Sequence, residues 1–359
     1  MTIKDYGWNE YFENEWKRYS AEGWIPGRIV ADYGQKIRVV TNEGELQVSR
    51  PLSRHEENML MAVGDWVALQ YFQDNREAQV LSVLTRKTKF SRTAAGIELK
   101  EQIIAANVDI VFLIQSLNRD FNMRRLERYM ITAWESGALP VVVLTKSDCC
   151  DDVEEKIAIV NTTVPGVEVH AISCLTGEGI PEILEYIAPG KTIALLGSSG
   201  VGKSTLLNYL AGREILKTGE VREYDDRGKH TTTHRELFLL PEGGLILDTP
   251  GMRSLSLWEA DTGMEAMFGD IEELVTKCRF FDCRHEREPG CAIRAALNDG
   301  SLESRRWESW SKLQKEMVNF EHRKKVKQRL KEKQLTKQIS RSKDNRKHTK
   351  TAIKNMDLD

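Results

Sequence analysis

The sequence lacks any apolar run of the roughly 20 residues that a membrane-spanning helix needs. Its first residues, MTIKDYGWNEYFENEWKRY, are polar and acidic, so the features of a secretory signal peptide are also missing. These absences favour a cytoplasmic protein with no membrane partner. The 359 residues, 40% apolar and 30% charged, suit a globular chain of two or three domains with a sizeable core.

Cysteine is scarce, and a cytosolic chain is not expected to hold its six cysteines in disulfides. Three of them, Cys278, Cys283 and Cys291, are bunched with His285 in the pattern Cys-x4-Cys-x-His-x5-Cys. Three thiolates and one imidazole suit tetrahedral Zn²⁺, although the spacing departs from paired Cys-x2-Cys knuckles. Four protein ligands leave no open position, so we expect one structural zinc ion.

The net charge of −2 conceals an uneven distribution. Residues 321–350 hold 13 Lys and Arg against 3 Asp and Glu, a local excess of +10. The rest of the chain keeps 39 of the 52 basic and 51 of the 54 acidic residues, which leaves it at −12. A basic segment on an acidic body predicts a polyanionic partner, and a solvated charged helix is the alternative interpretation.

Alternating apolar and polar residues from 21 to about 90 predict short strands, with Asn-Glu-Gly at a hairpin turn. About five strands in such a length fit a small closed barrel. We expect an OB-fold over residues 1–90, after a short helical leading segment; an SH3-like barrel would give the same pattern. OB barrels often bind single-stranded or irregular RNA.

The pattern changes near residue 90, where residues 85–100, TRKTKFSRTAAGIELK, predict a basic linker. Short apolar runs such as DIVFLI, LPVVVLT and KTIALLG then alternate with helical stretches, which is typical of a parallel sheet covered by helices. We expect this α/β domain over residues 91–260. A mostly α-helical domain with the zinc site and the basic tail is expected over residues 261–359.

A strand, TIALL, precedes a Gly-x4-Gly-Lys-Ser motif, and a helix, STLLNYLAG, follows it. This is the context that a phosphate-binding P-loop requires, because glycines let backbone N–H groups face phosphate oxygens and the helix N-terminus adds positive charge. Lys203 is expected at the β- and γ-phosphates and Ser204 on Mg²⁺. The predicted loop comprises Gly197, Ser198, Ser199, Gly200, Val201, Gly202, Lys203, Ser204 and Thr205.

The tetrapeptide DTPG follows the apolar strand GLIL and is interpreted as a second switch. Asp248 would hold Mg²⁺ through water, and the Gly251 N–H would meet the γ-phosphate. Between the P-loop and this switch, RGKHTTTHRE supplies threonines for the Mg²⁺ shell. The triplet 231–233 leaves the register open, and Thr233 is the preferred ligand. A threonine run is also ordinary strand material.

Thr145, Lys146, Ser147 and Asp148 follow an apolar strand and resemble a guanine-recognition loop. The Asp148 carboxylate would accept from guanine N1–H and the 2-amino group, whereas adenine would leave a buried charge unpaired. Thr145 stands where asparagine is usual. We expect this change to remove a tie between the base and the phosphate loop, and so to weaken nucleotide affinity. Ser173, in AISCLTGEG, resembles the loop that offers a backbone N–H to guanine O6.

The order of the motifs is reversed relative to an ordinary GTPase, because the base loops precede the phosphate loop. Both can still meet at the carboxyl edge of one sheet, and neighbouring chain termini make such a circular permutation tolerable. This order, with GKHTTT, DTPG and a trailing Cys/His cluster, resembles the circularly permuted GTPases of bacterial small-subunit ribosome biogenesis, the ribosome small-subunit-dependent GTPase A family. The resemblance extends over nearly the whole chain.

The resemblance implies a multidomain protein with an OB-fold barrel, a permuted P-loop GTPase domain and a zinc domain. It implies that the chain binds GTP or GDP with Mg²⁺ and one structural Zn²⁺. The implied activity is GTP hydrolysis stimulated by the small ribosomal subunit, late in that subunit's maturation, with contacts to its rRNA. We expect the protein to be a monomer.

Met252 stands where many GTPases have a glutamine that orients the attacking water. Methionine cannot do this, so we predict slow intrinsic turnover that a partner raises by ordering the switches. The candidate catalytic residues are Lys203, Thr233 and His230. His230 could orient water or could be an ordinary loop residue near phosphate, and Arg253 is a further candidate as a charge stabiliser.

The main alternative function is a non-catalytic RNA-binding factor in which the nucleotide only supports the fold. Lys203→Ala distinguishes the two, because it should abolish hydrolysis in a GTPase and spare biological function in a binding factor. An ATP-dependent kinase on the same P-loop is a third possibility, which Asp148 disfavours and which nucleotide competition would test.

Overall fold

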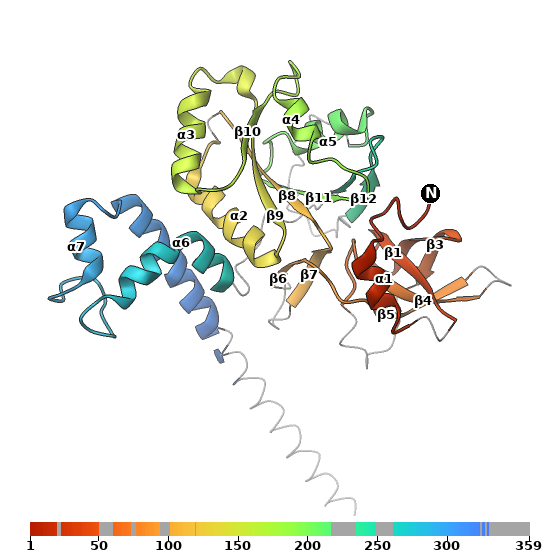
Figure 1. Cartoon of the computed structure of the whole chain (residues 1–359), viewed down its shortest axis with the longest axis horizontal. Helices are drawn as coiled ribbons and strands as arrows, with labels where there is room; N and C mark the ends of the chain where they lie inside the picture. The colour runs from red at the N-terminus through yellow and green to blue at the C-terminus, as the bar shows by residue number, and fades with distance from the viewer. Residues whose placement is uncertain are drawn as a thin grey trace, which may run out of the picture.

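The structure of the protein is a computed structural model, drawn in Figure 1. It describes residues 1–19, 23–49, 60–72, 77–93, 101–118, 120–216, 235–248, 261–323, 325–326 and 329. Structural statements below concern these residues. None of the helices among them is both long and apolar enough to cross a membrane.

Five antiparallel strands follow a short N-terminal helix. The helix, α1, begins after Asn9, whose side chain accepts a hydrogen bond from the backbone N–H of Tyr11 and so caps the first turn. In the sheet β1 lies between β2 and β4, β3 pairs with β2, and β5 pairs with β4 and also contacts β3. The elements are α1 (Glu10–Trp16), β1 (Ile25–Asp32), β2 (Lys36–Thr41), β3 (Gly44–Ser49), β4 (Trp66–Phe72) and β5 (Glu77–Val83).

The segment predicted to be a basic linker contains a strand, β6, instead. β6 (Lys89–Thr93) pairs antiparallel with β7 (Glu101–Ala106), and Val63 forms an isolated bridge to Ala105. The linker prediction was wrong for residues 89–93, because the basic side chains mask an alternation in which Phe90 is buried.

A mostly parallel sheet forms the centre of the molecule (Figure 1). Its order is β10-β9-β8-β11-β13-β12, with β12 antiparallel to β13, and every residue of β8 and β11 is buried. Near-continuous apolar strands of this kind are what a sheet covered on both faces requires. Its strands are β8 (Ile110–Ser116), β9 (Leu139–Thr145), β10 (Val169–Ile172), β11 (Thr192–Gly197), β12 (Arg235–Leu239) and β13 (Leu245–Asp248), and its helices are α2 (Met123–Ser136), α3 (Val153–Thr163), α4 (Ile180–Leu184) and α5 (Lys203–Ala211).

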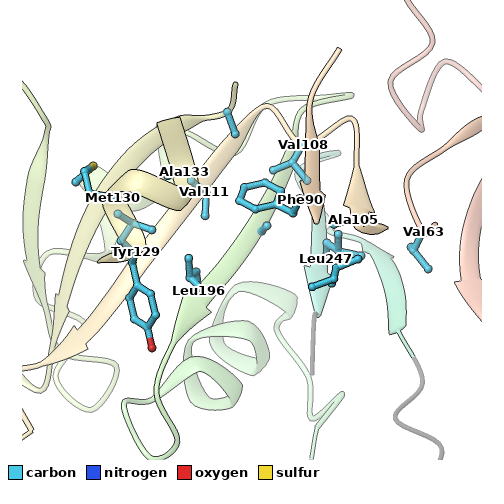
Figure 2. Close-up of a cluster of buried hydrophobic side chains, with 14 of the residues drawn as sticks. Val63, Phe90, Ala105, Val108, Val111, Tyr129, Met130, Ala133, Leu196 and Leu247 are labelled. Atoms are coloured by element: carbon cyan, nitrogen blue, oxygen red, sulfur yellow. The ribbon is translucent and has the colours of Figure 1, made fainter. Parts of the chain in front are cut away.

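Side chains on the two faces of the central sheet belong to two separate hydrophobic clusters. Figure 2 shows part of the first, where Val111 and Leu196 of the sheet lie near Met130 of α2. The second contains Phe112 of β8 and Leu206 of α5. Burying one such side chain fully contributes about 1.5–3 kcal/mol to the free energy of unfolding. Packing on both faces of the sheet therefore holds in place the strand ends from which the predicted base and phosphate loops begin.

The central sheet and the N-terminal strands form one continuous hydrogen-bonded sheet. β12 pairs antiparallel with β1 through Ala31↔Glu236 and Asp32↔Arg235. Arg38 of β2 forms an ion pair with Glu236 across this junction. No local pattern indicated this pairing, because the two strands lie about two hundred positions apart and register between distant strands is set by tertiary packing.

A buried arginine reinforces the same junction. The side chain of Arg28 is 2% exposed and donates to the backbone oxygens of Tyr6, Gly64 and Asn107 and to the Thr192 hydroxyl, which lies 2.9 Å away. Burial lowers the pKa of Arg28 to about 10, so it remains charged at neutral pH. Its bonds join β1 to the N-terminal segment, to the residues before β4 and after β7, and to β11.

Helices follow the central sheet towards the C-terminus. They are α6 (Asp261–Thr276), which is kinked at Phe268, α7 (Ala292–Asp299) and a helix over residues 304–323. α6 packs closely on α2 at Gly263. A Cβ at this position would lie 2.4 Å from the Ile131 carbonyl oxygen, so only glycine permits this approach. Ion pairs from Arg124 to Glu308 and from Arg128 to Glu316 join α2 to the helix over 304–323.

Candidate functional site

The predicted phosphate loop lies between β11 and α5, as its strand–loop–helix pattern requires. Gly200 and Gly202 have φ values of 79° and 95°, a region that favours glycine, and α5 begins at Lys203. The Lys203 ammonium donates to the carbonyl oxygens of Gly197, at 2.9 Å, and Ser198. The loop therefore turns back over its own lysine, and Ser204 and Thr205 occupy the first turn of the helix.

The predicted base loop lies directly against the phosphate loop. Thr145 ends β9, and its hydroxyl donates to the Val201 carbonyl oxygen at 2.6 Å. The next residue, Lys146, has a left-handed backbone and donates from Nζ to the Gly200 carbonyl oxygen at 2.8 Å. The amide of the usual asparagine is absent, but the shorter threonine hydroxyl reaches a backbone carbonyl of the P-loop, so the base loop itself stays tied to the phosphate loop. The weaker nucleotide affinity stays a prediction.

Asp148 and Ser173 come together from the ends of neighbouring parallel strands, β9 and β10. The buried Ser173 hydroxyl donates to the Asp148 carboxylate at 2.5 Å and accepts from the backbone N–H groups of Leu175 and Thr176, each at 3.2 Å. This bond and a contact from the Cys149 thiol lower the pKa of Asp148, so the carboxylate is ionised at neutral pH.

Asp148 is exposed in the structure, whereas the sequence argument placed its carboxylate at depth. It lies in the 3₁₀ turn η2 (Ser147–Cys149), which follows β9 beyond the packed part of the sheet. The Ser147 hydroxyl is buried and has no hydrogen-bond partner among the described residues. A ligand can therefore reach the exposed Asp148 carboxylate, which is ionised and held by Ser173, and donate hydrogen bonds to it.

Several predicted residues of the hydrolytic apparatus fall on parts of the chain that the structure does not describe. His230, Thr233, Gly251, Met252 and Arg253 all lie outside the described residues. The backbone of Asp248 ends β13, which pairs parallel with β11, the strand that leads into the phosphate loop.

Two residues beside the phosphate loop were missed by the sequence analysis. Arg125 Nη1 lies 2.7 Å from an Asp120 carboxylate oxygen and 2.8 Å from the Ser198 hydroxyl, and that hydroxyl donates to Asp120 at 2.6 Å. The hydrogen bond from Arg125 is the largest of the effects that lower the pKa of Asp120. The only sequence signal was their position after the buried strand β8, at the edge where ligands bind.

The cysteine and histidine side chains of the predicted zinc site meet in space. Their four ligand atoms lie within 4.8 Å of one another. His285 Nδ1 is 3.5 Å from Cys278 Sγ and 3.4 Å from Cys291 Sγ, and these two sulfurs are 4.0 Å apart. A tetrahedral zinc with ligand bonds of about 2.0–2.3 Å needs separations of this size, so these donors and Cys283 fit Zn²⁺.

The zinc loop is held by a carboxylate and an aromatic pair. Glu288 accepts from the backbone N–H groups of Arg284, Glu286 and Arg287, each at 3.0 Å. Its own backbone N–H and these three groups lower the pKa of Glu288 to about 2. The His285 ring meets Trp307 edge to face with the centroids 5.4 Å apart. The site is thereby connected to the helix over residues 304–323.

Comparisons with known proteins agree with this geometry. The sequence model of a family described as RsgA GTPase matches residues 83–258, and the model described as ABC transporter matches residues 182–357, a range that also includes the phosphate loop. "Small ribosomal subunit biogenesis GTPase RsgA 1" of Listeria innocua is 43% identical over 321 residues, which are 89% of this chain and 90% of that protein. A protein of Lactiplantibacillus plantarum, "Small ribosomal subunit biogenesis GTPase RsgA 2", is 45% identical over 299 residues, with 82% and 84% covered.

Solved structures share the fold. YjeQ from Thermotoga maritima superposes with a TM-score of 0.60 at 24% identity, covering 82% of this chain and 99% of that one. YloQ, titled a circularly permuted GTPase, gives a TM-score of 0.58 at 24% identity, covering 84% and 96%. The circularly permuted order inferred from the motifs is therefore a property of the fold.

Proposed function

The chain belongs to the RsgA GTPase family, and from this premise we propose that it binds GTP between the base loop and the phosphate loop and hydrolyses it there. The contacts of Thr145 with Val201 and of Lys146 with Gly200 carry the proposal. They bring the two loops together at the carboxyl edge of the sheet, where one nucleotide can contact both. Asp148 would accept from the N1–H and 2-amino groups of guanine, with Ser173 holding its carboxylate in place.

The triphosphate would lie on the backbone N–H groups of the loop from Gly197 to Gly202, with the Lys203 ammonium at the β- and γ-phosphates. Ser204 fits Mg²⁺, because its hydroxyl lies in the first turn of α5 and hydroxyl oxygen is a ligand that Mg²⁺ prefers. A bound Mg²⁺ would neutralise charge that develops on the phosphates. We assign Thr233 and Asp248 to its shell and His230 to the attacking water, on sequence grounds alone.

The partner that we propose is the small ribosomal subunit, as in the names of the relatives. Its rRNA is the polyanion that the excess of basic residues over 321–350 fits, and the chain would act late in the subunit's maturation. Backbone-dominated contacts to RNA make association fall steeply with salt. The protein would act as a cytoplasmic monomer whose turnover rises on the subunit.

The N-terminal strands are proposed to form an OB-fold that contributes to RNA binding. The closed circuit β1-β2-β3-β5-β4 supports this assignment, because a five-stranded Greek-key barrel joins its strands in that way. We place the barrel at residues 1–90, the permuted G domain at 91–260 and the zinc domain at 261–359. β6 straddles the first of these boundaries, so the barrel and G domain meet through packed strands.

The zinc ion is proposed to be structural. Cys278, Cys283, His285 and Cys291 would fill a tetrahedral shell and leave no position for a substrate. Cys278 follows the end of α6 and Cys291 is the N-cap of α7, so the ion would join the two helix ends and supply part of their folding free energy.

Turnover with Lys203→Ala tests the function. Purified protein should hydrolyse GTP slowly, faster with purified small subunits, and the variant should lose both rates while it keeps its fold. Retention of the protein's effect on subunit maturation by this variant would instead favour the non-catalytic RNA-binding factor. Competition between ATP and GTP separates both from a kinase, since a kinase of the ATP type would not prefer guanine.

A further inference from the structure

Two side chains from outside the phosphate loop, Asp120 and Arg125, hold the side chain of Ser198 in the loop, and we name the three residues the Ser198 cluster. The Ser198 hydroxyl donates to Asp120 at 2.6 Å and accepts from Arg125 Nη1 at 2.8 Å, while Arg125 and Asp120 form an ion pair at 2.7 Å. Every member of the cluster therefore contacts the other two. None of them belongs to the motif residues that bind base, phosphate or Mg²⁺, except that Ser198 lies in the phosphate loop itself.

The fold places this cluster by a rigid connection. Gln115, which is 1% exposed in β8, accepts from the backbone N–H of Asn122 at 2.8 Å and donates to its carbonyl oxygen at 3.0 Å. Asn122 is also the N-cap of α2, accepting from the backbone N–H of Arg125. Arg125 thus starts from a capped helix end that is tied to a buried strand next to β11.

Ser198 is contacted on two sides, and this gives the cluster its effect on the site. Its hydroxyl is held by Asp120 and Arg125, whereas its carbonyl oxygen accepts from the Lys203 ammonium. A displacement of the Ser198 residue would move the carbonyl that positions Lys203 and the peptide N–H groups that follow. Groups that stabilise a phosphoryl transition state act only when they are held in place before the reaction.

We propose that Arg125, together with Asp120, is a positioning residue of the phosphate loop, and that it acts through the Ser198 hydroxyl. The inference rests on the proposed hydrolysis of GTP at this loop. Arg125 is suited to the task because its planar guanidinium can engage a carboxylate and a hydroxyl at the same time, which a lysine cannot do with the same geometry. Its side chain is 30% exposed and that of Asp120 38%, so both are held at the surface rim of the loop.

A double-mutant cycle tests the proposal, with Arg125→Ala, Ser198→Ala and the combined variant. Each single change should lower kcat for GTP roughly tenfold with a smaller rise in KM, because a loosened loop loses pre-organisation. The kcat of the combined variant should lie within about twofold of the kcat of the more impaired single variant, since both changes remove one shared contact. Arg125→Lys should recover part of the loss, through its remaining charge beside Asp120.

Arg124→Ala is the matched control, because Arg124 is the preceding residue of α2 and pairs with Glu308 instead of the loop. Its kcat should stay within about twofold of the parent. The partly exposed pair contributes little to stability, so all variants should fold, which thermal melting followed by circular dichroism verifies.

Two results would overturn the proposal: an Arg125→Ala variant with unchanged kcat, or losses from Arg125→Ala and Ser198→Ala that multiply. Multiplying losses would mean that Arg125 acts on the phosphates directly, since Ser198→Ala leaves its charge in place. A parent protein that binds GDP but hydrolyses no GTP would remove the proposed function instead. The same cycle, measured on the affinity for fluorescent GDP, would then decide the positioning role.

Discussion

The hydroxyl of Thr145 and the carbonyl oxygen of Val201 lie 2.6 Å apart, and this hydrogen bond joins the end of β9 to the phosphate loop. Thr145 is 3% exposed, so the bond is shielded from water. The predicted base loop and the predicted phosphate loop are thereby held at a fixed separation. The base and the phosphates of a purine nucleotide are also held apart by covalent bonds, so a nucleotide of matching length can contact both loops without a rearrangement of the protein.

Replacing Thr145 by valine should loosen this connection. Valine has the same shape but no donor, so the buried Val201 carbonyl would lose its partner, at a cost of about 1–3 kcal/mol in the free energy of unfolding. The affinity for GDP should fall as well. Urea unfolding and fluorescent-nucleotide titration measure both effects, and Thr145→Ser, which keeps the hydroxyl, serves as the control. Equal behaviour of valine and serine at this position would contradict the assigned role.

Asp148→Asn should change which base is preferred. The amide keeps an acceptor for N1–H but presents a donor where guanine carries its 2-amino group, so GTP affinity should fall by about ten- to a hundredfold. Xanthosine triphosphate, which has an oxygen at position 2, should gain in competition. Ser173→Ala removes only the hydroxyl that orients the carboxylate, and it should weaken GTP binding without changing the preferred base. A variant Asp148→Asn that still selects GTP would place guanine recognition elsewhere.

Removal of zinc should loosen the C-terminal helices and be visible without any activity assay. His285 contacts Trp307, and Trp307 stacks on Trp310 with centroids 5.0 Å apart, so tryptophan emission should change when a chelator is added. The melting temperature should fall, because ligand binding to the native state alone stabilises it. Cys278→Ser should reproduce both changes without chelator. Unchanged emission and melting after verified zinc loss would show that the ion has no structural role.

Alkylation of Cys174 should depend steeply on pH. Burial, and to a smaller extent the charge of Asp148, raises the pKa of Cys174 to about 11. A thiol whose pKa is raised stays protonated to higher pH, and only the thiolate reacts, so its rate should rise about tenfold from pH 8 to 9 and again from 9 to 10. A short cysteine peptide with blocked ends in the same tube should level off earlier, since an ordinary peptide thiol has a pKa near 8.5. Peptide mass spectrometry follows the site, and a rate that levels off by pH 9 would argue against the raised pKa.

Local patterns in the sequence were enough to predict the strand–loop–helix around the P-loop motif and the cluster of the four candidate zinc ligands. Gly202 and Lys203 follow a strand and open a helix, and Cys278 to Cys291 span a short segment, so neither prediction depended on distant contacts. The contact of Thr145 with the phosphate loop was not predicted, because the residue was judged by the side chain that usually stands there. The structure instead gives the hydroxyl a backbone carbonyl as its partner.

Contacts between distant segments were beyond the sequence argument. Asp120 and Arg125 meet Ser198 across more than seventy positions, and neither residue belongs to a recognisable motif. Lys89 and Arg92 suggested a linker, since charge along the chain is visible while the partner strand β7 is not. Side-chain pairing of this kind is decided by packing, which composition and periodicity do not encode.

A single cut in the backbone between β7 and β8 would not release the N-terminal strands from the rest of the protein. β1 would remain paired with β12, Arg38 with Glu236, and Arg28 with Thr192. The two fragments should copurify as a nicked complex, and they should reassemble when they are expressed as separate polypeptides. A chain that folds in this way behaves mechanically as one body, so a load applied to the N-terminal strands reaches the sheet that carries the phosphate loop.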